Sequence, residues 1–212
     1  MSTPHSQLMR EASAKQHKEA ESSGFVTQLM KGELSLDAYA QYLANLAWVY
    51  EALEVQTNQG EPFVSSEPLW DERLDRLASI ERDLEELGHP HWREEFPTSE
   101  ALEDYCAQLT RLNGRADHRL IAHHYTRYLG DLSGGQAISA LVARHYGATP
   151  MQLQFCRFTD IEDLVRYKEQ YRANLDGLSL SDRQQDELVA EVQLAFELNK
   201  NLFQDLGKLV SA

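Results

Sequence analysis

The chain has 212 residues, of which 42% are hydrophobic and 25% are charged. This length and composition suit one globular domain with a sizeable core, and they exclude a disordered tail, a collagen-like repeat and a coiled-coil rod. With 20 basic and 34 acidic residues the formal net charge is −14, so nucleic acid and anionic membrane surfaces should repel the protein.

Apolar residues recur every three or four positions in several stretches, which is the spacing of amphipathic helices. We find no alternating strand pattern, no internal repeat and no linker. The sequence therefore predicts an all-α protein of about eight helices in a single domain over residues 1–212. The clearest predicted helices cover residues 36–53, 70–87, 102–112, 161–175 and 188–202.

Capping residues stand at the ends of these stretches. Ser35 is a predicted N-cap of the first, and Gly88 and Gly114 are predicted to end the second and third. Ser181 and Gln184 have the spacing of a capping box ahead of the last helix.

Three glycines, Gly130, Gly134 and Gly135, interrupt a stretch that is otherwise helical on both sides. Each costs about 0.8–1 kcal/mol relative to alanine in a helix interior. A glycine lacks Cβ, so another body can lie directly against the helix backbone. Phosphate is a poor candidate because Gln136 stands where a P-loop has lysine, which leaves a tightly packed helix or a broad flat ligand. Asp131 beside the first glycine favours the ligand.

His17 has the most suggestive surroundings of the eight histidines. Arg10 lies seven residues earlier on the same helix face, about 10 Å along the axis, and Glu21 lies one turn later, able to orient the imidazole. This spacing suits an iron ligand whose macrocycle carries carboxylates, although an ordinary exposed helix would also explain it. The pairs at 89/91 and 123/124 give little support for zinc.

Charge and cysteine usage add context. Residues 111–144 carry a net charge of +3 whereas residues 51–110 carry −12, which fits an anionic ligand or acidic redox partner near the glycines, or simply a salt-bridged face. Cys106 and Cys156 form no metal-binding motif and are expected to be reduced. With no signal-peptide pattern and no membrane-spanning stretch, we expect a cytoplasmic protein.

The run His124-Tyr-Thr-Arg-Tyr-Leu-Gly-Asp-Leu-Ser-Gly-Gly-Gln136 resembles the distal-helix signature of the heme oxygenases, the bacterial ones above all. His17 with Ala20-Glu21 resembles the proximal segment of that family, and further blocks match at 48–54, 167–172 and 196–203. The resemblance covers essentially the whole chain. It implies a heme oxygenase-like fold that holds heme b between a proximal and a kinked distal helix.

The resemblance also implies an activity, namely cleavage of heme with O2 and reducing equivalents to biliverdin, carbon monoxide and Fe2+, for example in iron acquisition. Its electron donor would be a ferredoxin or a flavoprotein reductase, and we expect a monomer. A non-catalytic heme carrier or sensor and a thiaminase-like helical enzyme are the alternatives. The resemblance assigns catalysis to Tyr50, Arg127, Gly130, Asp131, Gly134 and Asn199, and heme binding to Arg10, His17, Glu21, Tyr125, Lys168 and Arg172.

Within these sets, the resemblance makes His17 the iron ligand, with Glu21 near its other nitrogen. The backbone at Gly130 and Gly134 would press on the heme, and Asp131 would hold ordered water that delivers protons. The family often has lysine where this chain has Arg10, so the charge is kept but the geometry of heme carboxylate binding differs.

Overall fold

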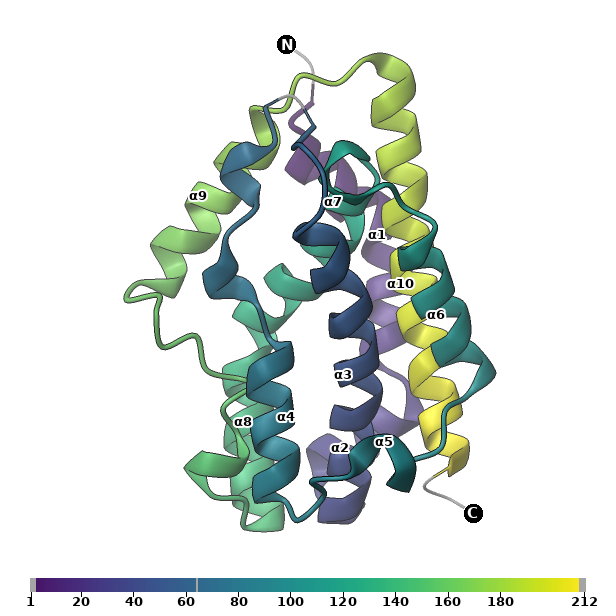
Figure 1. Ribbon diagram of the computed structural model, residues 1–212, viewed down its shortest axis with the longest axis vertical. Helices are drawn as coiled ribbons and strands as arrows, with labels where there is room; N and C mark the ends of the chain where they lie inside the picture. Colours follow the sequence, from purple (N-terminus) through teal and green to yellow (C-terminus); the bar gives the residue numbers. More distant parts are fainter. Residues whose placement is uncertain (1–2, 64, 210–212) are drawn as a thin grey trace.

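The computed structural model describes residues 3–63 and 65–209, and over these residues every regular element is helical (Figure 1). The prediction of an all-α fold is confirmed. The α-helices are α1 (His5–Glu21), α2 (Gly24–Lys31), α3 (Leu36–Thr57), α4 (Leu77–Glu86), α5 (Trp92–Glu95), α6 (Glu100–Thr110), α7 (Leu120–His124), α8 (Gly130–Tyr146), α9 (Leu164–Asp176) and α10 (Asp182–Leu209). Short 3-10 turns are η1 (Glu67–Leu69), η2 (Glu72–Leu74), η3 (Gly114–Ala116) and η5 (Pro150–Gln152), and the π-helical turn η4 covers Tyr125–Leu129.

Helix α3 is the centre of the core and packs against α4 and α6 (Figure 1). It begins where the sequence predicts, because the Ser35 hydroxyl accepts the N–H of Ala38 at 3.0 Å. Tyr39, Leu46 and Tyr50 on this helix are completely buried. Burial of this whole face fixes α3 as the scaffold on which Tyr50 is held.

The predicted helix ends are confirmed at Gly88 and at Ser181, whereas the prediction that Gly114 ends the third helix is wrong, because α6 ends at Thr110 and Gly114 begins η3. Gly88 has φ of +95°, and the N–H of His89 donates to the Leu84 carbonyl at 2.8 Å, which closes the end of α4. Before α10, Gln184 Oε1 accepts the Ser181 N–H at 3.0 Å and the Ser181 hydroxyl accepts the Gln184 N–H at 3.4 Å.

The predicted helix over 70–87 is wrong in its first half. Two 3-10 turns separated by extended residues occupy 67–75, and α4 begins only at Leu77. The Asp71 carboxylate accepts a hydrogen bond from the N–H of Arg73, two residues later, at 3.1 Å. Such a local side-chain bond to the backbone favours a turn over a helix. The Glu54 carboxylate then accepts the N–H groups of Arg76 and Leu77 at 2.6 and 2.9 Å, a helix cap supplied from 22 residues away.

Two other boundaries shift by a few residues. Helix α9 starts at Leu164 instead of 161, because the Asp163 carboxylate accepts the N–H groups of Val165 and Arg166. Helix α6 ends at Thr110, and Leu112 is buried in the core beyond it. The apolar spacing therefore identifies these helices but overextends them.

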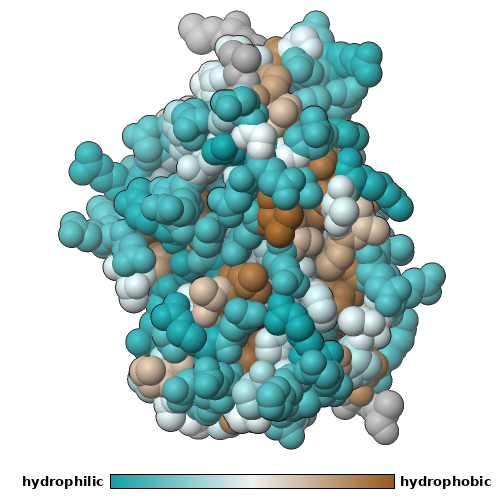
Figure 2. Space-filling model, viewed as in Figure 1, coloured by the Kyte–Doolittle hydropathy of each residue, from teal (hydrophilic) through white to brown (hydrophobic). Residues whose placement is uncertain are grey.

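The long terminal helices α1 and α10 pack against each other along their length (Figure 1). The face shown in Figure 2 is mostly hydrophilic, with small hydrophobic patches. Among the described residues, no helix combines the length and apolar character needed to cross a bilayer. Cys106 and Cys156 are free thiols, one half-buried and one buried, as the sequence predicts.

Candidate active site

A cavity of about 510 Å³ lies where α1, α9 and α10 face the segment 125–134. Its volume is within the range of small-molecule sites, but two other cavities also measure about 500 Å³, so its lining distinguishes it. The lining combines predicted heme-binding residues with both key glycines. It consists of Arg10, Ser13, Ala14, His17, Tyr125, Thr126, Leu129, Gly130, Ser133, Gly134, Arg172 and Phe196.

The wall opposite α1 is one continuous helical segment formed by α7, η4 and α8. A π-helical turn over Tyr125–Leu129 joins the two α-helical parts. Such turns bend helices and are frequent at functional sites. The break in regular helix thus precedes the glycines, since Gly130 itself has ordinary helical angles of −62° and −51°.

The glycines of α8 fall into two groups. A Cβ added at Gly130 or Gly134 would meet no atom within 4 Å, whereas one at Gly135 would lie 3.5 Å from Cα and O of Cys156. Gly130 and Gly134 line the cavity. Gly135 thus packs in ordinary contact against the turn at Cys156, whereas the space beside Gly130 and Gly134 is open to a ligand.

His17 lies on α1 across the cavity from the glycines. Its ring is exposed, and the centroid lies 5.3 Å from that of Phe196 on α10 in an edge-on arrangement. The predicted partner Glu21 is the last residue of α1, and its side chain lies outside the described part of the structure. His17 is thus placed to meet a ligand held against Gly130 and Gly134.

Cationic side chains gather at one edge of the cavity. Arg10 and Arg172 both line it and both lie close enough to Tyr125 to act on its titration. Burial raises the pKa of the Tyr125 phenol, and the two guanidinium groups oppose the rise. Lys168, the fourth predicted carboxylate ligand, is half-buried on α9 and is not part of this lining. Three of the four predicted residues therefore converge.

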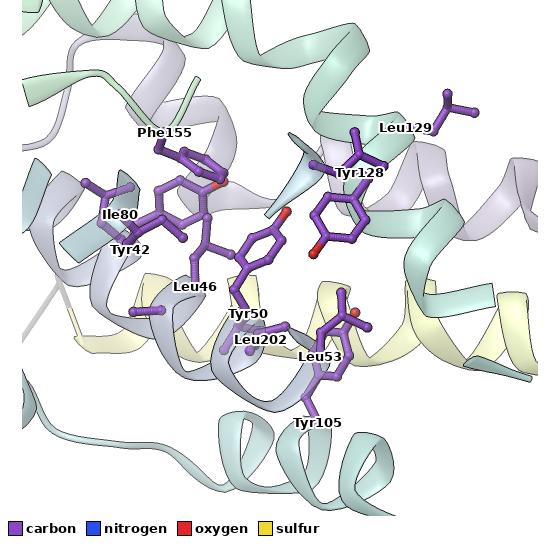
Figure 3. Close-up of a cluster of buried hydrophobic side chains, with 14 of the residues drawn as sticks. Tyr42, Leu46, Tyr50, Leu53, Ile80, Tyr105, Tyr128, Leu129, Phe155 and Leu202 are labelled. Atoms are coloured by element: carbon purple, nitrogen blue, oxygen red, sulfur yellow. The ribbon is translucent and has the colours of Figure 1, made fainter. Parts of the chain in front are cut away.

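The four predicted polar catalytic residues form one hydrogen-bonded network behind the distal wall. The Tyr50 hydroxyl donates to the Asp131 carboxylate, and Arg127 Nε donates to the same hydroxyl at 3.4 Å. Arg127 Nη1 donates to Asn199 Oδ1 at 2.8 Å, and its Nη2 lies 3.6 Å from the Asp131 carboxylate. Figure 3 shows Tyr50 from α3 beside Tyr128, with ring centroids 5.6 Å apart.

Asp131 is the chemically unusual member of this network. Burial raises the pKa of its carboxyl well above the ordinary value. Its side chain is 14% exposed, against 5% for Arg127. Burial therefore favours the protonated carboxyl, whereas the Tyr50 hydroxyl and the nearby Arg127 favour the carboxylate, and this balance is typical of groups that take part in proton transfer.

The sequence analysis missed several cavity residues. Phe196 lies in a block that resembles the family, three residues before Asn199 on α10, and this helical spacing could have revealed it. Ser13 and Ala14 share the face of α1 that carries His17, a signal that was also available. Nothing in the sequence separates Thr126 or Ser133 from their neighbours.

One histidine of each pair considered for zinc is held by a carboxylate instead. Nε2 of His123 lies 2.8 Å from the Glu191 carboxylate, and Nδ1 of His89 lies 2.7 Å from Glu95. Within residues 3–63 and 65–209, no three His, Cys, Asp or Glu side chains come together as a metal site. The arginines of 111–144 are partly neutralised, since Arg119 forms a two-point pair with Asp117.

Comparisons with known proteins identify the family of the chain. The heme oxygenase family model matches residues 3–205. Heme oxygenase 1 of Gallus gallus is 34% identical over 215 residues, covering 100% of this chain and 72% of that protein. Heme oxygenase 1 of Nostoc sp. is also 34% identical, over 100% of this chain and 90% of its own. The crystal structure of heme oxygenase-1 from the cyanobacterium Synechocystis sp. in complex with heme superimposes with a TM-score of 0.89 at 31% identity, covering 99% of this chain and 95% of that one. The chain belongs to the heme oxygenase family.

Proposed function

We propose that this protein is the enzyme that opens heme oxidatively to biliverdin, carbon monoxide and iron. The observation that carries the proposal is a single cavity that combines an exposed imidazole, an open glycine backbone and two guanidinium groups at one edge. Heme is flat, largely apolar and carries two carboxylates, so it needs these three features together. Bound heme supplies the iron at which O2 is activated and the ring that is opened.

In this proposal His17 is the neutral iron ligand on the proximal side. A thiolate ligand donates electron density to the iron and thereby favours O–O cleavage. A neutral imidazole donates less, so it favours that cleavage less. Across the cavity the Gly130 and Gly134 backbone would hold one face of the heme and limit the space above it. Arg10, Tyr125 and Arg172 would hold the heme carboxylates by charge and hydrogen bonding, which would fix the rotation of the ring. Lys168 completes this set from α9.

Asp131 is the proposed proton donor through water. Its carboxyl keeps a proton more readily than an exposed aspartate because burial raises its pKa. Tyr50 fixes one carboxylate oxygen by hydrogen bonding, and Arg127 holds the other side while Asn199 anchors the guanidinium. The residues thus hold the donor in place instead of contacting the ring themselves.

Electrons would come from a ferredoxin or a flavoprotein reductase, and we propose that the enzyme works as a cytoplasmic monomer. Two free thiols suit a reducing compartment, and burial raises their pKa to about 11 for Cys106 and about 12 for Cys156, so they resist oxidation.

The test is an aerobic absorbance time course with one equivalent of hemin, followed by ascorbate in the presence of catalase. We expect a sharp Soret band that decays into the red absorption of biliverdin. Catalase removes free peroxide as another cause of heme loss. A Soret band that forms and persists, also with a ferredoxin system, would instead indicate a heme carrier, and no Soret band would overturn heme binding altogether.

A further inference from the structure

A buried contact joins the distal wall of the cavity to α9. Nδ1 of His124 lies 2.8 Å from the hydroxyl of Tyr171, and the two rings are parallel within 1° with centroids 5.6 Å apart. Both side chains are at most 3% exposed. Neither belongs to the cavity lining, and neither has a role in the proposed reaction.

Burial lowers the pKa of His124 to about 3, so the imidazole is neutral. Its Nδ1 and the Tyr171 hydroxyl share one hydrogen bond between two neutral groups. Trp70 and Tyr128 enclose the same ring edge-on, with centroids 5.1 and 4.6 Å away. Asp71 is the charged group that acts on this imidazole, and it opposes the effect of burial. The histidine is therefore a neutral hydrogen-bond partner of Tyr171, enclosed by aromatic rings.

The position of the pair in the chain connects it to the cavity. Tyr125 comes directly after His124, at the start of the π-helical turn, and Arg172 comes directly after Tyr171 on α9. Tyr125 and Arg172 both line the cavity edge. The Arg172 guanidinium also lies close enough to Tyr125 to oppose the rise in the pKa of that phenol caused by burial. The buried pair thus stands directly behind the two side chains that would meet one edge of the ligand.

Other side-chain hydrogen bonds tie α9 to different parts of the fold. The Tyr167 hydroxyl donates to Asp71 at 2.8 Å, and Asn174 Nδ2 donates to the Pro68 carbonyl at 3.0 Å. These two contacts hold α9 against η1 and η2, away from the distal wall. Among the side-chain hydrogen bonds of the described residues, the contact between His124 and Tyr171 is the one that links α9 to the segment bearing Tyr125.

We infer that His124 and Tyr171 are a positioning pair that sets the spacing of Tyr125 and Arg172, and thereby the seating of heme and the bridging carbon that is opened. This inference rests on the proposed placement of the heme carboxylates beside those two residues. The pair acts through its neighbours, since it touches neither the cavity nor the ligand.

The test compares Tyr171→Phe and His124→Gln with Tyr167→Phe, a matched control that removes one hydroxyl from the same helix. Arg172→Gln tests the placement itself. Two readouts are measured on each heme-loaded protein. Proton NMR of the ferric cyanide complex gives the ratio of heme orientations, and chromatography gives the ratio of biliverdin isomers. Thermal unfolding of each variant checks that it folds.

We expect Tyr171→Phe and His124→Gln to shift both ratios about fivefold or more, as loss of one buried hydrogen bond allows, while Tyr167→Phe leaves them unchanged. Equal shifts in Tyr167→Phe would show general loosening of α9 and overturn the inference. Unchanged ratios in Tyr171→Phe with a shift in Arg172→Gln would refute the pair but keep the carboxylate placement. Unchanged ratios in Arg172→Gln would overturn both.

Discussion

Alanine at Gly130 or Gly134 should stabilise the heme-free protein while impairing its reaction. The added Cβ meets no atom within 4 Å at either position, so it causes no clash. It removes the helix-interior cost of glycine, about 0.8–1 kcal/mol, which should raise the midpoint of thermal unfolding by about 2–4 °C in a domain of this size.

The same methyl group would project into the cavity that Gly130 and Gly134 line. One extra carbon in a fitted pocket changes discrimination by about tenfold or more, so turnover of heme with ascorbate should fall by at least that factor. Gly135→Ala is the matched control. Its Cβ would make an ordinary 3.5 Å contact with Cys156 instead of entering the cavity, so turnover should stay unchanged.

The assay combines thermal unfolding of the heme-free variants with heme titration and turnover. Stabilisation with unchanged heme affinity and turnover would show that the glycine face is not the substrate face. Destabilisation would show that the apparent space beside the backbone is filled in solution. Either result would refute the reasoning that connects the glycine cost to ligand binding.

Three further changes probe the site and its supports. Asp131→Ala should still give a Soret band but lose ring opening by about 100-fold or more, the usual contribution of a general acid; normal biliverdin yield contradicts this. His17→Ala should lose turnover, and added imidazole should restore part of it; full activity without imidazole refutes iron ligation. Asn199→Ala leaves a hydrogen-bonding site of the Arg127 guanidinium without its acceptor, so urea unfolding should show about 1.5–3 kcal/mol less stability. Finally, burial depresses the folded-state pKa of His124 to about 3 from 6.5. Its contribution to stability is therefore complete above pH 6.5 and is lost as the pH falls toward 3, at up to about 1.4 kcal/mol per pH unit. The free energies of unfolding of the wild type and of His124→Gln, measured in urea, should converge as the pH is lowered.

The sequence predicts the elements whose causes are local. Ser35 caps α3 through a neighbour three residues on, and the positive φ of Gly88 ends α4 without help from elsewhere. The false helix over 70–76 has a distant cause, because the N-terminal cap of α4 is the Glu54 carboxylate. Apolar spacing cannot reveal a cap that arrives from another helix.

The site shows the same division. The residues taken from the resemblance converge well, since Tyr50, Arg127, Asp131 and Asn199 form one network although they come from three helical segments. Lys168 is one turn from Arg172 on α9 yet is absent from the cavity lining. The π-helical turn before Gly130 has no sequence signal of its own, and it decides which neighbouring side chains face the cavity.

The distal segment explains why a costly glycine stands next to a buried acid. Gly130 faces the cavity, whereas the next residue, Asp131, turns its carboxylate toward Tyr50 and Arg127 on the inner side of the helix. The described cavity lining includes the glycine but not the aspartate. In the proposed reaction, a proton from this carboxyl would reach the heme through water at the helix edge, where a side chain at Gly130 would obstruct it. The absence of Cβ at Gly130 would then serve both proposed roles, because it would admit the flat substrate and leave a passage for the proton.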